Sequence, residues 1–161
     1  MKGFLIFMAV VVGGGVFAIV RFEDLATGYL ATLAKTEGGP GGSPAFETLK
    51  VEKPDDFKKK YQPILEKRLK IAVMSNYLGN GEFFEKVATE TKMLYLNAPT
   101  DKNPRFGKMM VMLGERLEER QQFGPAFEQY KEFKANFPDH PDVKMAEVAI
   151  QRLRIKYGLV D

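Results

Sequence analysis

The spacing of residues between Gly107 and His140 constrains the fold of this chain more than any other feature of its sequence. Apolar residues recur there at intervals of three and four, which predicts two amphipathic helices packed on each other. Gly114 and Ala126 are small, so we expect them to face each other and let the helices approach closely. Pro138 ends the second helix because it cannot donate the next backbone hydrogen bond. The residues expected to form this contact are Met110, Leu113, Gly114, Leu117, Ala126, Tyr130 and Phe133, with Pro138 at its end.

The same residues resemble a tetratricopeptide repeat, a helix–turn–helix unit of about 34 residues with a Leu-Gly, Ala, aromatic and Pro rhythm. The turn holds Gln121-Gln122-Phe123, where the family usually has a glycine. The link from Phe137 to Asp142 resembles repeats of periplasmic proteins such as the Tol–Pal cell-division coordinator and outer-membrane assembly lipoproteins. The resemblance implies an all-α domain that binds other proteins.

Weaker helical patterns flank this repeat on both sides. We expect a helix from about Phe57, capped by Asp55 and Asp56 and kinked or interrupted at Pro63. The other expected elements are a turn at Gly79–Gly81, a return helix over Glu82–Asn97, and a last helix over Val143–Tyr157 stopped by Gly158. The domain should therefore contain about five helices, or about two and a half repeats.

The amino-terminal segment Gly3–Val20 holds eighteen residues without a charge. As a helix it is roughly 27 Å long, just enough to cross the hydrocarbon core of a bilayer. A cleaved signal peptide is the alternative, but the apolar run is longer than a usual signal core and no clear small-x-small site follows it. We therefore expect an uncleaved transmembrane helix.

Small residues within this segment are spaced four apart. Ala9 pairs with Gly13 and Gly14 pairs with Ala18, so each pair forms a small-xxx-small face that favours packing against another membrane helix. The alternative is simple tolerance of glycine in a membrane helix.

The composition of the chain changes along its length and divides it into three parts. Residues 1–36 are the transmembrane helix and an amphipathic stem carrying Phe22, Leu25, Tyr29 and Leu33 at helical spacing. Residues 37–54 are a flexible Gly/Pro-rich linker followed by an extended segment. Residues 55–161 form the α-helical domain.

Charge and cysteine content exclude several classes of protein. The chain has no cysteine, which rules out disulfides and thiolate chemistry, and its net charge is only +3. Mixed charge of this kind is typical of a solvated surface and argues against a nucleic-acid partner. One local basic segment, Lys58–Lys70, is interpreted as solvated helix surface, with a lipid or acidic partner as the alternative.

No group of residues has the pattern of a catalytic or metal site. His140 is the only histidine, and beside Asp139 and Asp142 it is expected in a capping loop rather than on a metal. Neither a Ser–His–acid set nor a phosphate-binding glycine loop is visible. We therefore expect no catalytic residue, cofactor or metal.

The resemblance also implies a partner-binding groove lined by the first helix of each repeat. Lys108, Val111, Glu115 and Glu119 lie three and four residues apart and so share a helix face beside the packing face. This face is expected to meet a partner segment; the alternative is an ordinary solvated face.

These observations predict a non-catalytic, single-pass accessory subunit that holds other proteins in a larger membrane complex. Its expected partners are protein subunits and, through the amino-terminal helix, membrane lipid. The expected location is a bacterial inner membrane, with the helical domain in the periplasm. The alternative is a membrane-anchored receptor or chaperone-like adaptor that captures peptides in the groove.

Overall fold

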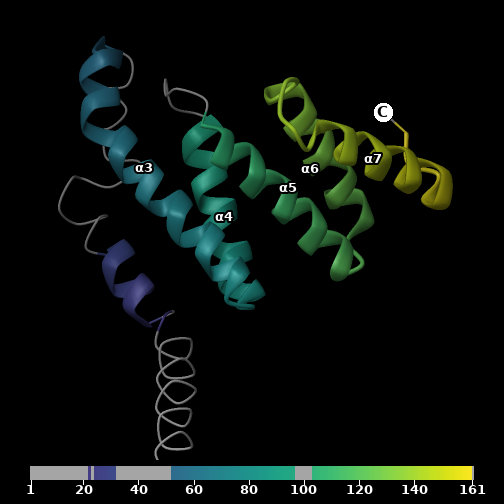
Figure 1. Ribbon diagram of the computed structural model, residues 1–161, viewed down its shortest axis with the longest axis horizontal. Coiled ribbons are helices and arrows are strands. Elements are labelled where there is room, and N and C mark those ends of the chain that lie inside the picture. Colours follow the sequence, from purple (N-terminus) through teal and green to yellow (C-terminus); the bar gives the residue numbers. More distant parts are fainter. Residues whose placement is uncertain (1–21, 23, 32–51, 97–102, 161) are drawn as a thin grey trace, which may run out of the picture. The chain divides into compact units, whose positions relative to one another are not determined.

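The computed structural model describes residues 22, 24–31, 52–96 and 103–160, and all regular structure within them is helical (Figure 1). The chain divides into two compact units, Met1–Phe46 and Glu47–Asp161. In the first unit residues 24–31 form a helix, as predicted for the stem, and Leu25 and Tyr29 are exposed. None of the helices in the described ranges is both long and apolar enough to cross a membrane. The predicted span Gly3–Val20 and the linker residues 38–44 lie outside those ranges.

The described residues of the second unit form the five helices expected of it, and Glu52, in the segment predicted to be extended, is helical as well. The five helices are α3 (Pro54–Tyr77), α4 (Gly81–Leu96), α5 (Pro104–Glu119), α6 (Phe123–Asn136) and α7 (Val143–Tyr157). Helix α3 packs on α4, α5 on α6, and α6 on α7, while smaller contacts of α5 with α3 and α4 join the first hairpin to the second (Figure 1). The all-α prediction is confirmed for the described part of the chain.

Local sequence sets the helix ends. The Asn103 side chain caps α5 by accepting a hydrogen bond from the backbone N–H of Arg105 at 2.9 Å. Gly79 and Gly158 adopt the left-handed conformation, with φ of 77° and 65°, at the ends of α3 and α7. Gln121 also has a positive φ, 59°, in the turn where tetratricopeptide repeats usually carry glycine. The predicted turns and the stop at Gly158 are confirmed.

Helix α3 differs from its prediction in two ways. Lys53, not Asp55 or Asp56, is its N-cap residue. The two aspartates lie in the first turn, where their negative charge interacts favourably with the positive end of the helix dipole. The helix also runs unbroken through Pro63. The apolar face that carries Phe57 and Tyr61 before Pro63 continues with Ile64 after it, and all three side chains are buried. Burial of apolar side chains before and after Pro63 stabilises the continuous helix.

Aromatic side chains join the two hairpins into one core. Tyr95 of α4 stacks on Phe106 of α5 with ring centroids 4.5 Å apart, and Phe106 meets Phe137 edge-on at 5.6 Å. Phe137 in turn stacks on Phe133 of α6 at 6.0 Å. Since all four rings are buried, separating α4 from α5 would expose aromatic surface on both sides.

Candidate functional site

The predicted packing residues do lie between α5 and α6, with one change of partner. Leu113, Gly114, Ala126 and Tyr130 are buried as expected. A Cβ atom added at Gly114, however, would lie 2.5 Å from Cε1 of Tyr130, and its three nearest atoms all belong to that ring. Gly114 is thus closed by Tyr130, and the expected pairing of Gly114 with Ala126 is corrected: the glycine makes room for a ring, not for another small residue.

The two remaining packing residues lie at the edge of the contact. Leu117 is half-buried and helps line a shallow groove between α4 and α6, so it belongs less to the core than predicted. Pro138 is exposed and lies just beyond α6, which ends at Asn136. Its predicted position after the end of the second helix is confirmed.

The four residues of the predicted partner-binding face differ in their exposure to solvent. Glu115 and Glu119 are exposed, and Lys108 is half-buried. Val111 is fully buried and is therefore placed in the core rather than on the face. The reason is that neighbouring helices cover α5 on nearly all sides along its first three turns, from Phe106 to Gly114, where Lys108 is the one residue not buried.

Electrostatics tie Lys108 to the start of α7. Its Nζ donates a hydrogen bond to Oδ2 of Asp142, the N-cap residue of α7, at 3.0 Å. This hydrogen bond raises the pKa of Lys108, and the charges of Asp142 and Glu115 raise it further. The pKa of Glu115 is also raised, mainly by loss of solvation and then by neighbouring carboxylates, although Lys108 opposes the shift. Lys108 therefore has a structural role as well as a place on the face.

A second link between α5 and α7 was not predicted. Nη2 of Arg152 contacts both carboxylate oxygens of Glu118 at 2.7 Å, and Tyr130 donates its hydroxyl hydrogen to the same carboxylate at 3.0 Å. Burial and the negative charge of Glu118 raise the pKa of Tyr130 strongly. One carboxylate thus joins α5, α6 and α7, and the ring of Tyr130 closes over Gly114 beneath it.

His140 is a structural residue in the described fold. Its Nε2 lies 2.9 Å from the carbonyl oxygen of Pro104, and its Nδ1 lies 3.2 Å from the backbone N–H of Asp142. A neutral ring satisfies both contacts by donating from Nε2 and accepting at Nδ1. The ring also covers Gly107, where an added Cβ would lie 2.8 Å from its Cδ2 atom. The loop residue predicted as a cap therefore fixes the α6–α7 loop to the start of α5.

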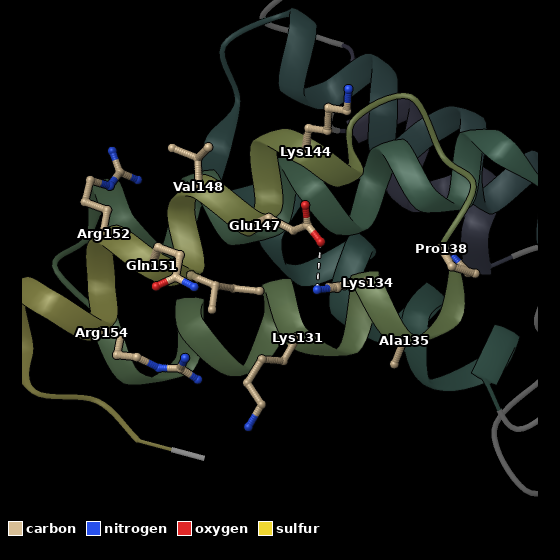
Figure 2. A pocket seen from close by; sticks show the side chains of 11 residues that line it. Lys131, Lys134, Ala135, Pro138, Lys144, Glu147, Val148, Gln151, Arg152 and Arg154 are labelled. Carbon is tan, nitrogen blue, oxygen red and sulfur yellow. Dashed lines mark ion pairs between the residues drawn. The ribbon is translucent and has the colours of Figure 1, made fainter.

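A groove of about 1260 Å³ runs along α6 and α7, and sequence reasoning missed it (Figure 2). Every residue that lines it belongs to these two helices or their connecting loop. The lining has five cations, namely Lys131, Lys134, Lys144, Arg152 and Arg154, and one acid, Glu147. An ion pair of 2.7 Å between Lys134 and Glu147 joins the two helices (Figure 2). The sequence signal was the recurrence of Lys and Arg around exposed aliphatic residues late in the chain.

Other predicted residues cannot be placed. Ala9, Gly13, Gly14 and Ala18, assigned to membrane-helix packing, lie outside the described residues. Within the described ranges no group of three or more His, Asp or Glu side chains is arranged to hold a metal ion.

Comparisons with protein-family models, with curated proteins and with solved structures found no match to this chain.

Proposed function

We propose that this chain is a non-catalytic, single-pass membrane accessory subunit whose tetratricopeptide-like helical domain holds other proteins in a larger complex. The eighteen uncharged residues of Gly3–Val20 support the membrane anchor. The alternation of two helical hairpins and a last single helix supports the repeat-like domain. The proposed location of the domain is the periplasm.

The observation that carries this proposal is the exposed face beside Lys108. Glu115 and Glu119 are open to solvent on α5, and Met74 and Tyr77 at the end of α3 are 49% and 67% exposed. Helices α3 and α5 are in contact, and the charge of Tyr77 adds slightly to the raised pKa of Lys108. Large exposed apolar side chains beside charged groups are typical of protein-binding surfaces.

The structure makes the test of this face more specific. Reversing the charge of Lys108 would break its ion pair with Asp142 and disturb the start of α7, so Lys108 is left unchanged. The informative variant is Glu115→Lys with Glu119→Lys, since both residues are exposed and Glu119 makes only an ion pair with Arg116 one turn earlier. We expect this double variant to lower recovery of the partner several-fold while helicity stays unchanged.

A matched control separates the face from net charge. Glu52→Lys with Glu128→Lys makes the same change in charge at two exposed positions outside α3 and α5, and Glu128, like Glu119, pairs with a cation three residues away. Recovery of the partner with this control should equal that of the wild type. Equal recovery with both double variants would show that the face does not bind. Recovery of varied clients at low ratios would support the adaptor function instead of the accessory subunit.

A further inference from the structure

Helix α7 has a second face that is largely exposed, although α6 reaches it through the ion pair between Lys134 and Glu147. Lys144, Glu147, Val148, Gln151, Arg154 and Ile155 recur at intervals of three and four residues and share this face. Val148 is 68% exposed and Ile155 is 83% exposed. The opposite face of α7, with Ala149 and Leu153, is buried.

The position of this face follows from the order of the helices. Helix α3 packs against α4 and α5 packs against α6, so each first helix of a pair is followed by a second that covers it. Helix α7 comes next in the alternation, yet among the described residues no helix follows it. The groove along α6 and α7 lies at the last helix pair of the described part of the chain (Figure 2).

The groove is lined mainly by positively charged side chains, which favours an acidic helix as its occupant. The five lining cations are accompanied by Glu147, and Glu118 and Glu128 pair with Arg152 and Lys131 from outside the lining. Lys144 has no ion-pair partner in the described part of the chain, and Ile150 and Val148 contribute apolar surface.

Other occupants fit this groove less well. A second copy stacked end to end would bring the exposed lysines of α3, among them Lys59, Lys67 and Lys70, against the cations of α7. A bilayer surface also attracts lysines, but it is flat and would not fill a groove. The groove between two helices has room for another helix. At about 1260 Å³ the groove also exceeds the usual range of small-molecule pockets, roughly 300–1,000 Å³.

We propose that the α6–α7 groove binds an acidic amphipathic helix of a partner protein, whose apolar face covers Val148 and Ile155 and whose carboxylates meet Lys144 and its neighbours. This surface is separate from the Glu115–Glu119 face, and the proposal stands whether or not that face binds. It adds to the proposed scaffold a second surface with a partner of defined chemistry.

The test uses the full chain in phosphatidylcholine nanodiscs and a labelled synthetic peptide. The peptide has about 18 residues, enough for a stable helix, with Leu along one face and Glu on both flanks. A twin peptide carries Lys in place of every Glu. Fluorescence anisotropy, corrected with empty nanodiscs, should show binding of the acidic peptide at least tenfold tighter than binding of its twin.

Two variants locate the site. Lys144→Glu with Val148→Asp alters only exposed positions, and Glu is favourable in the first turn of α7, so the fold should be retained. We expect this variant to bind the acidic peptide at least tenfold more weakly. The control, Lys70→Glu with Met93→Asp, makes the same change in net charge at exposed positions on α3 and α4 and should bind like the wild type.

Four results would overturn the proposal. They are equal binding of the two peptides, no binding of the acidic peptide, equal loss in the variant and its control, and self-association in sedimentation that Val148→Asp abolishes. Binding to phosphatidylserine vesicles without any binding of the acidic peptide would assign the groove to a lipid surface instead. None of these results bears on the Glu115–Glu119 face, so the two proposals can fail separately.

Discussion

At Gly107 and Gly114 the surface of α5 that meets the rest of the unit has no side chain, and a ring fills each space. His140 lies over Gly107, and Tyr130 lies over Gly114. The sequence predicted that Gly114 permits a close approach, because a Leu-Gly pair recurs in the repeat it resembles. It placed Tyr130 in the same contact but did not predict that its ring lies directly on Gly114, since spacing gives the helix face but not the rotamers of the neighbours.

The contact at Gly114 can be tested by adding one methyl group. Gly114→Ala would force its Cβ against Tyr130, and we expect a loss of about 1–3 kcal/mol in the free energy of unfolding. Gly124→Ala in α6 is the control, because its added Cβ meets nothing within 4 Å. Urea unfolding followed by circular dichroism measures both. A Gly114→Ala variant as stable as Gly124→Ala would contradict the contact.

His140 should contribute to stability and not to binding. His140→Ala removes the hydrogen bond to the Pro104 carbonyl and opens a space over Gly107, so we expect a loss of about 1–3 kcal/mol. That is more than expected for an exposed capping residue, because the side chain is only 8% exposed. The same urea titration tests it. A variant of wild-type stability would contradict the structural role, and a stable variant with lost partner binding would place His140 in a binding site.

Val111 shows a limit of residue-level prediction. Its spacing from Lys108 and Glu115 assigned it to an exposed face, but α5 is covered on more than one side and Val111 is fully buried. Periodicity in one helix cannot reveal how many neighbours surround that helix. Of the four residues assigned to the face, only the three that carry charge are at least partly exposed.

At the scale of elements, helix ends were the most predictable feature and helix continuity the least. Gly79 and Gly158 each act locally, so the sequence sufficed to predict a turn and a helix end. Pro63 was expected to kink or interrupt a helix, and because α3 runs through it the interruption is ruled out. Tertiary packing keeps α3 continuous across Pro63, and the sequence of one helix does not reveal its packing partners.

Pro63 should therefore weaken α3 without breaking it. Pro63→Ala restores a backbone donor inside the helix and removes the ring, so we expect stabilisation by up to about 3 kcal/mol. Pro63 is exposed, and its replacement costs no core packing. Thermal unfolding should show a higher midpoint for the variant. An unchanged or lower midpoint would mean that the proline does not strain α3.

For the helical unit as a whole, the junction between α4 and α5 should make stability sensitive to alkaline pH. Burial raises the pKa of Tyr95 to about 12, and the charge of Glu66 adds to the shift. An unfolded tyrosine loses its proton near pH 10, whereas folded Tyr95 keeps it. The free energy of unfolding should thus fall between about pH 10 and 12, by at most about 1.4 kcal/mol per pH unit from this group.

A tyrosine-to-phenylalanine comparison isolates that contribution. Tyr95→Phe should lose stability less steeply above pH 10 than the wild type, because it has no hydroxyl to titrate. Tyr77→Phe is the control, since Tyr77 is 67% exposed, and its slope should match the wild type. Urea unfolding at several alkaline pH values gives the slopes. Equal slopes for Tyr95→Phe and the wild type would show that Tyr95 is not buried at this junction.

The composition of the complex formed by the full-length chain tests the proposed scaffold most directly. The tagged chain is purified from its native membranes in mild detergent, and quantitative mass spectrometry gives the molar ratio of each protein that accompanies it. A non-catalytic accessory subunit predicts one or a few partners at a constant, near-integer ratio that survives repeated purification. A chain that is recovered alone, or with many proteins at low and variable ratios, would contradict it.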